Sequence, residues 1–522
     1  GAMENTTAVI HGEGAYQKPG QLIDENVWET TIAHELFHHW FGDLVTTESW
    51  SNLTLNESFA NYSEYLWLEH KYGKLAANMH LYKNNQDYKN GQAFDKHLVR
   101  FDYDDKEDMF DLVSYNKGGA ILHMLRNYLG DEAFFEGLKN YLNKYKYQSA
   151  EVPELRIVFE ELIGKDLNWF FNQWYYAGGH PKINVSYDYN TLQKTVTVNL
   201  KQVQSGTFQF PFAIDIFENS KRIRHNVFVE GKDASFTFPY TVQPQLIQVN
   251  ADGVVLCDIT ENRSLQESIF QLKNATNYEH RRIALEEVVK YQANKDAFNA
   301  VVSAMNDKSY QIRILALQKI DLINKFAKKE AIDKIMSMAN NDEKTLVQAE
   351  AVGTLAKLTD PNLKAIFQKA LQSESYSVLG KALVGMYYID KELAIKKSKE
   401  LPDEVKGILA TPLTKIFVEE KDEEELPFIA KNVISGMFLS NNDDVKATYE
   451  KAFDLIIESN NALAIENLTK DMVEKGKQYK QFNFDKVVVN LMRKMIQAQK
   501  KANGSNRERN IAIIQEAMEK IL

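Results

Sequence analysis

The spacing of apolar residues along the chain predicts helices first, then strands, then helices again. In the first part, aromatic and aliphatic residues recur at helical intervals, as in NESFANYSEYLWLEHKYG at residues 56–73. From residue 182 apolar and polar residues alternate instead, as in KINVSYDY (182–189) and KTVTVNL (194–200), which is the period of a half-buried strand. Beyond about residue 260 the alternation is lost and helix-sized segments return. We therefore predict three domains, at residues 1–180, 181–259 and 260–522.

The middle part contains further short runs of apolar residues. They are FAIDIF (212–217), RHNVFVE (224–230), SFTF (235–238) and QLIQVN (245–250), and turn-forming residues separate them. Short strands joined by turns are typical of antiparallel sheets packed face to face. The pattern predicts a small antiparallel β-sandwich that ends near Cys257.

The last part shows a loose internal repeat of small and aliphatic residues. The copies are Ala284-Leu285-Val288, Ala316-Leu317-Ile320, Ala351-Val352-Leu355 and Ala382-Leu383-Met386. Their spacings, in the low to mid thirties, are typical of stacked helix pairs. We expect an all-α superhelix of HEAT- or armadillo-like helix pairs, and an ordinary helical bundle is the alternative.

The stretch AHELFHHWFGD at residues 33–43 combines polar groups with large apolar side chains. A helix over residues 27–44 would place an apolar residue at every fourth position, which predicts that the helix is largely buried. These apolar positions are Trp28, Ile32, Leu36, Trp40 and Leu44.

The same stretch carries candidate metal ligands. His34 and His38 are four residues apart, so their imidazoles lie one turn above each other and can bind one ion. Glu57 follows on the next predicted helix, with residues 39–56 between it and the pair. Two imidazoles and one carboxylate leave zinc an open position for water, as in catalytic sites. We therefore predict one catalytic Zn²⁺ per chain, with Glu35 as the general base that takes a proton from the water.

Composition narrows the classes of function. The 522-residue chain is 44% hydrophobic and 26% charged, as expected for a soluble globular protein of several domains. A formal net charge of −10 offers no basic surface for nucleic acid. Cys257 is the only cysteine, which excludes an intrachain disulfide and a paired-cysteine zinc site. No apolar run approaches the roughly 18 residues of a membrane helix, and both a cytoplasmic and an exported location stay open.

Five motifs relate the sequence to a known family. They are GAMEN (1–5), HELFHHWFGDLVT (34–46), WSNLTLNESFANY (50–62), SYNKGGA (114–120) and QWYYAGGHP (173–181). In the order and spacing of these motifs the sequence resembles the aminopeptidase N family of zinc exopeptidases. The resemblance extends over the whole chain and implies a thermolysin-like, mainly helical α+β catalytic domain ahead of the sandwich and the superhelix.

The resemblance also implies roles for individual residues. Glu4, in the exopeptidase motif, would bind the free α-amino group of a peptide, while Gly1, Ala2 and Met3 would run beside the substrate backbone. A buried carboxylate that pairs with an ammonium group restricts cleavage to the first peptide bond, because an internal segment would leave the acid uncompensated. Tyr115 would stabilise the oxyanion, since a hydroxyl donates a hydrogen bond without carrying charge.

One further acid and three departures from the family pattern concern the surroundings of the zinc site. Glu64 lies seven residues after Glu57, two turns along the same helical face, and we expect it to orient a zinc histidine; a surface acid is the alternative. The family commonly has Gln, Asn and Gly where this chain has His39, Asp43 and Ser58. None of the three replaces a catalytic group.

The start of the chain departs most from the family. Relatives carry an N-terminal β-rich domain and the first strands of the catalytic domain ahead of GAMEN, and the sequence opens directly at that motif. We therefore expect a fragment or one chain of a nicked protein, with the upstream segment as a possible partner. The alternative, that residues 1–3 remain from a removed tag, requires a coincidental completion of the motif.

The sequence thus predicts a zinc aminopeptidase that hydrolyses the first peptide bond of peptides with a free amino end. One alternative is a lipid epoxide hydrolase that uses the same site. The other is a catalytically silent interaction protein built on the helical repeats. The preferred first residue and the oligomeric state leave no trace in the sequence.

Overall fold

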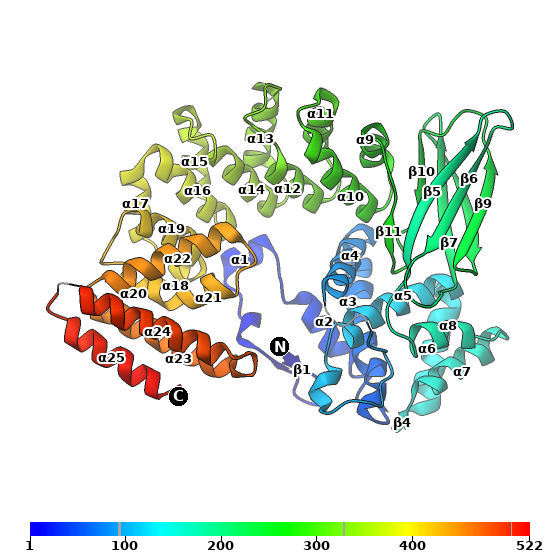
Figure 1. Ribbon diagram of the computed structural model, residues 1–522, viewed down its shortest axis with the longest axis horizontal. Coiled ribbons are helices and arrows are strands. Elements are labelled where there is room, and N and C mark those ends of the chain that lie inside the picture. The colour runs from blue at the N-terminus through cyan, green and yellow to red at the C-terminus, as the bar shows by residue number, and fades with distance from the viewer. Residues whose placement is uncertain (92–94, 327–328, 503, 522) are drawn as a thin grey trace. The chain divides into compact units, whose positions relative to one another are not determined.

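The computed structural model of the chain describes residues 1–91, 95–326, 329–502 and 504–521 (Figure 1). The chain forms two compact units, one of residues 1–17 and 26–326 and the other of residues 18–25 and 327–522. The expectation of a mainly helical chain with small sheets is confirmed. The domain boundaries near residues 180 and 259 stay predictions. Among the described residues, no helix has both the length and the apolar character that crossing a membrane requires.

Up to residue 174 of the chain, the larger unit is mostly helical and contains two small two-stranded sheets. The strands are β1 (Ala2–Met3), β2 (Ile10–His11), β3 (Val45–Thr47) and β4 (Gln148–Ala150). The helices are α2 (Glu29–Phe37), α3 (Thr54–Tyr72), α4 (Lys74–Asn90), α5 (Gly118–Leu129), α6 (Asp131–Tyr145), α7 (Val152–Ile163) and α8 (Asn168–Trp174). Three 3₁₀ turns (Glu13–Ala15, Trp50–Asn52 and Lys106–Met109) and one π-helical turn (Val113–Lys117) complete this part.

Helix α3 is the centre of this part, because it packs against α2, α4 and α5. It ends at Gly73, whose φ of +85° reverses the chain directly into α4 and suits only glycine. The contact with α5 is close: a Cβ on Gly118 would lie 1.8 Å from Oγ of Ser58, and one on Gly119 would lie 2.3 Å from Oδ1 of Asn61. The two glycines therefore allow α5 to approach the helix that carries Glu57.

A β-sandwich follows in the same unit (Figure 1). Its strands are β5 (Lys182–Asn190), β6 (Thr195–Gln202), β7 (Phe210–Glu218), β8 (Lys221–Val229), β9 (Asp233–Pro239), β10 (Leu246–Val249) and β11 (Asp258–Thr260). One sheet has the order β11-β5-β6-β9 and the other the order β10-β7-β8. The expectation of a fully antiparallel sandwich is wrong at one edge, where β11 pairs parallel to β5. The reason is that the chain reaches β11 from the other sheet, not through a hairpin.

Four helices complete the larger unit and form two successive pairs. They are α9 (Leu265–Asn274), α10 (Tyr278–Val288), α11 (Lys295–Ala304) and α12 (Tyr310–Lys319), with a 3₁₀ turn at Val289–Tyr291. Their starts follow from capping: the side chains of Ser264, Asn277 and Asn294 accept hydrogen bonds from the first-turn amides of α9, α10 and α11.

The described residues of the smaller unit form helices joined by turns and loops, with no strand among them. Its helices are α1 (Pro19–Asp24), α13 (Lys329–Asn341), α14 (Thr345–Ala356), α15 (Lys364–Ala370), α16 (Tyr376–Ile389), α17 (Lys391–Lys399), α18 (Asp403–Ile408), α19 (Ala410–Glu419), α20 (Leu426–Ile429), α21 (Val433–Phe438), α22 (Asp443–Glu458), α23 (Ala462–Gln478), α24 (Phe484–Lys501) and α25 (Arg507–Glu519). Short 3₁₀ turns lie at Pro361–Leu363, Ala430–Asn432 and Lys480–Phe482. Although α1 comes early in the sequence, it belongs to this unit, where Asp24 accepts hydrogen bonds from Thr345 (2.7 Å) and from the amide of Ser377 (3.0 Å).

Candidate metal and active site

Helix α2 carries the two histidines, but it is shorter than the sequence suggests. The prediction of a helix over residues 27–44 is wrong, because α2 begins at Glu29 and ends at Phe37, with His38 as its C-cap. Gly42 has a φ of +145°, which belongs to a turn and not to a helix. The chain turns there, and the amide of Asp43 donates to the carbonyl of His38 (2.9 Å).

The burial of α2 is also the reverse of the prediction. The side chains of Ile32, Leu36 and Trp40 are 47%, 55% and 44% exposed, whereas His34 and Glu35 are buried. The helix faces α3 with its polar residues. Burial of polar residues next to another helix requires that they find partners there, and α3 supplies them.

Three buried groups face one another between α2 and α3. Oε2 of Glu57 lies 3.4 Å from Nε2 of His34 and 3.4 Å from Nε2 of His38. Four ligands at about 2.1 Å from a tetrahedral zinc ion lie about 3.4 Å apart, so these spacings fit one ion bound by all three. Oε2 of Glu57 is buried and has no hydrogen-bond partner among the described residues, as expected of a ligand atom. The residues therefore fit a metal ion.

The charges of these groups are consistent with a site for a cation. Burial disfavours protonation of His34, but the carboxylates of Glu57 and Glu64 outweigh it and raise the pKa of His34 to about 10. The pKa of His38 is raised in the same way by Glu57. Burial opposes ionisation of Glu57, yet the two histidines lower its pKa to about 2. Protons thus hold the positive charge that a bound metal ion would replace.

The outer nitrogens of the two imidazoles are fixed by hydrogen bonds. Nδ1 of His34 lies 2.9 Å from Oε1 of Glu64, and Nδ1 of His38 lies 3.0 Å from the carbonyl oxygen of Phe41. Because both acceptors can take the Nδ1 proton, each Nε2 would offer its lone pair to a metal ion once the ion has displaced the Nε2 proton that faces Glu57. Glu64 therefore lies beside a histidine of the pair, and its role in orienting that histidine stays a prediction.

The carboxylates of Glu4 and Glu35 lie beside His38. The ligand atoms of Glu4, Glu35 and His38 all lie within 4.8 Å of one another. Burial raises the pKa of Glu35, which brings this carboxylate closer to the range of a general base. Glu4 follows strand β1, which pairs antiparallel with β2 through Ala2 with His11 and Met3 with Ile10. The GAMEN segment is thus held as an extended chain that places Glu4 beside Glu35, while Gly1 and Met3 are exposed.

Tyr115 approaches the site from the π-helical turn at Val113–Lys117. Its ring is stacked on that of His34, with the centroids 5.8 Å apart and an interplanar angle of 10°. Burial raises the pKa of Tyr115 strongly, and the carboxylate of Glu57 raises it further. The phenol therefore keeps its proton and can donate a hydrogen bond in this pocket.

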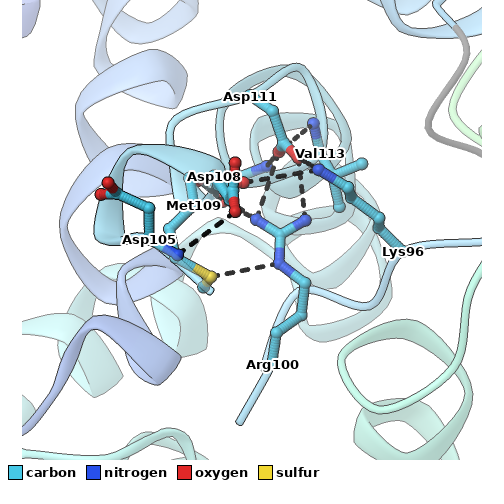
Figure 2. Close-up of polar contacts among 8 residues, drawn as sticks. Lys96, Arg100, Asp105, Asp108, Met109, Asp111 and Val113 are labelled. Carbon is cyan, nitrogen blue, oxygen red and sulfur yellow. Dashed lines mark hydrogen bonds and ion pairs between the residues drawn. The ribbon is translucent and has the colours of Figure 1, made fainter. Parts of the chain in front are cut away.

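A polar network that the sequence did not reveal fixes the π-helical turn, and Figure 2 shows the guanidinium of Arg100 at its centre. Asp111 accepts hydrogen bonds from the amides of Val113 (3.0 Å) and Ser114 (3.1 Å). Its carboxylate also pairs with Arg100 (2.9 Å) and Lys96 (3.0 Å), and Arg100 donates to the carbonyl oxygen of Met109 (3.1 Å). Asp111 caps the turn, and an acid just ahead of SYNKGG is a signal that could have been noticed. Arg100 is distant in sequence from the turn and gave no such signal.

Comparison with known proteins shows a family that the first third of the chain resembles. Residues 1–174 match the model of the Peptidase family M1 domain. This part of the chain is therefore similar to peptidase family M1, in agreement with the resemblance predicted from the motifs.

Individual relatives are similar to parts of the chain. "Probable aminopeptidase 1" of Sulfurisphaera tokodaii is 29% identical over 265 residues, which are 48% of this chain and 33% of that protein. Aminopeptidase M1-A of Oryza sativa is 30% identical over 47% of this chain and 29% of its own length. Aminopeptidase N of Streptomyces lividans is 35% identical over 34% of this chain and 22% of its own length. The match thus spans a third or less of each of these relatives.

A solved structure has a similar fold over the whole chain. Legionella pneumophila aminopeptidase A, crystallised with aspartic acid, superposes with a TM-score of 0.59 at 16% identity, covering 100% of this chain and 67% of that one. At this identity the likeness concerns the fold alone.

Proposed function

We propose that the chain is a zinc-dependent aminopeptidase that hydrolyses the N-terminal peptide bond of peptides with a free α-amino group. The observation that carries the proposal is the buried triangle of His34, His38 and Glu57, with Glu35 and Glu4 directly beside it. The similarity of residues 1–174 to the Peptidase family M1 domain supports it. We propose one Zn²⁺ per chain, held by the two Nε2 atoms and the Glu57 carboxylate, and peptides as the substrates.

The remaining residues have separate roles in the proposed reaction. Bound zinc supplies Lewis-acid activation of the attacking water and of the substrate carbonyl. Glu35 accepts the proton of the water and later gives it to the leaving amine, a role that its burial favours. Tyr115 donates a hydrogen bond to the oxygen that becomes negative in the transition state. Glu4 pairs with the substrate ammonium group and thereby sets the position of the first peptide bond.

For the rest of the chain we propose the predicted division into catalytic domain, sandwich and helical repeats. The repeat proposal is supported by the order of the helices, since α9 to α16 form four successive pairs. The second helix of each pair buries its copy of the repeated residues: Ala284 in α10, Ala316 in α12, Ala351 in α14 and Ala382 in α16. HEAT- or armadillo-like packing would place these alanines at equivalent positions.

Hydrolysis of aminoacyl arylamides, each compared with its N-acetylated form, tests the proposed activity. We expect zinc-dependent cleavage of the free-amine substrates only, because acetylation removes the charge that Glu4 binds. Glu35→Gln should lower kcat by at least about 10³-fold while the protein still binds one zinc per chain. Glu132→Gln, at an exposed position of α6, is the matched control and should keep full activity. Equal cleavage of acetylated substrates, or full activity of Glu35→Gln, would contradict the proposal.

A further inference from the structure

Glu64 contacts two histidines, not one. Its Oε1 atom lies 2.9 Å from Nδ1 of His34, and its Oε2 atom lies 3.1 Å from Nε2 of His80. The side chains of His34, Glu64 and His80 are only 10%, 14% and 15% exposed. The carboxylate therefore bridges a proposed zinc ligand on α2 and a histidine on α4.

The chemistry of the bridge fixes the direction of both hydrogen bonds. An ionised carboxylate can only accept, so His34 donates through Nδ1 and His80 donates through Nε2. Each oxygen of Glu64 then has its own donor, and rotation of the carboxylate would break both bonds. The amide nitrogen of Asn61 lies 3.5 Å from Oε1 of Glu64. The amide nitrogen of Asn84 lies 3.1 Å from Nε2 of His80, but because that nitrogen carries the proton donated to Glu64, the Asn84 amide donates to Oδ1 of Asn61 (3.4 Å) instead. Neither amide replaces His80 at Oε2 of Glu64.

The two proposed zinc histidines are held by different means. Nδ1 of His38 donates to the backbone carbonyl of Phe41, which the fold itself keeps in place. Nδ1 of His34 depends on a side chain, and a side chain keeps its orientation only when its own contacts restrict its rotamers. The orientation of His34 is therefore the one that a further residue can control.

From this we infer that His80 is a positioning residue of the metal site: it holds Glu64 so that Nε2 of His34 points at the ion. The inference rests on the proposed zinc site and extends it by one residue that touches neither the ion nor the substrate. Loss of His80 leaves Oε2 of Glu64 buried without its donor, so the carboxylate can turn towards other donors and release His34.

The test is the affinity of the apoprotein for zinc alone, measured by competition with a chelator of known affinity. Substitution of residues that support metal ligands typically weakens metal binding by about 10- to 100-fold. We expect about a tenfold loss for His80→Ala, a smaller loss for His80→Gln, which keeps a donor, and the larger loss for Glu64→Ala. His70→Ala, at an exposed histidine of α3, is the matched control and should bind zinc like the wild type.

A double substitution separates positioning from a general loss of structure. In the Glu64→Ala background, His80→Ala should cause no further loss of affinity, because its effect passes through Glu64. An unchanged zinc affinity in His80→Ala, or an equal loss with and without Glu64, would overturn the inference. If His80→Ala does not fold, as judged from its circular dichroism, His80→Gln carries the same test in both backgrounds. Failure of the proposed function gives a different result, namely a wild-type protein that binds no zinc.

Discussion

At the scale of single residues, Tyr115→Phe removes one hydroxyl group from the proposed site and keeps the aromatic ring. Its ring stacks on His34, and phenylalanine keeps that contact. Tyr115→Phe should lower kcat by about 10²- to 10³-fold, because only the hydrogen bond to the oxyanion is lost. KM and the zinc affinity should stay close to the wild-type values.

Steady-state kinetics on a free-amine arylamide checks this prediction. Tyr128→Phe is a suitable control, since no hydrogen bond is seen for its hydroxyl among the described residues and its ring contacts Trp169. A fall in zinc affinity with Tyr115→Phe, or an unchanged kcat, would show that the hydroxyl does not act on the oxyanion.

Lys117 makes the stability of the fold depend on pH. It is fully buried and donates to the carbonyl oxygen of Ala177 (3.1 Å), and burial lowers its pKa to about 7 from the ordinary value of 10.5. Between these two values the unfolded chain holds a proton that the folded chain lacks, so the free energy of unfolding rises with pH, by up to about 1.4 kcal/mol per unit. Below pH 7 both states are protonated and this contribution to the pH dependence disappears.

The variant Lys117→Met should lose this contribution. We therefore expect the stability of the wild type, relative to that of the variant, to increase as the pH is raised from 7 to 10. Urea unfolding of both proteins at several pH values measures the difference, in which all other titrating groups cancel. Parallel pH profiles would mean that Lys117 is charged in the folded protein.

The sequence predicted the site residues that are related by spacing along helices, and it missed those that reach the site only through tertiary contacts. His34, His38 and Glu57 follow from spacing along two helices, and Glu64 from two further turns of α3. His80 and Arg100 act through contacts whose partners are fixed only by the tertiary fold. A single sequence carries no periodicity or motif for such contacts.

At the scale of elements, the π-helical turn determines where Tyr115 lies. Asp111 binds two amides of this turn and is itself held by Arg100 and Lys96 (Figure 2). Asp111→Asn removes the charge from these contacts, and hydrogen bonds to charged groups contribute about 1.5–3 kcal/mol each. We expect kcat to fall by about tenfold, which corresponds to about 1.4 kcal/mol, with zinc binding unchanged.

The combination with Tyr115→Phe shows whether the turn acts through the tyrosine. In that background Asp111→Asn should have little further effect on kcat, since the hydroxyl that it positions is already absent. Asp105→Asn is the control within the same network, because Asp105 only caps the neighbouring 3₁₀ turn. Full additivity of the two substitutions would argue against this role of Asp111.

The elements also show which patterns predicted the structure well. Alternation located the first two strands of the sandwich, because β5 and β6 bury alternate residues in a common core. The apolar pattern at residues 27–44 was misleading for the opposite reason: α2 buries His34 and Glu35, which we propose to act at the metal site, and leaves Ile32 and Leu36 exposed. A functional site can thus reverse the face that hydrophobicity alone would bury.

At the scale of the whole molecule, the chain crosses between its two units twice near its start. Residues 18–25 form part of the smaller unit, where Asp24 binds Thr345 and Ser377, more than 300 positions further along the sequence. No local pattern predicts partners so far away in the sequence. The predicted division into three domains therefore did not assign residues 18–25 to the smaller unit. The proposed site residues all lie in the larger unit, from Glu4 to Tyr115.

Zinc should therefore stabilise one unit and not the other. A ligand that binds only the folded state stabilises it by about 4 kcal/mol at a thousandfold excess over Kd, which for a unit of this size corresponds to a shift of several degrees in Tm. In calorimetry, a chelator should lower the Tm of one transition and leave the Tm of the second unchanged.

The double variant His34→Ala/His38→Ala is the control. Its first transition should have the lowered Tm without chelator, and the chelator should cause no further change. A chelator effect that persists in this variant would place the stabilising metal elsewhere. A shift of both transitions together would mean that the two units unfold as one cooperative system.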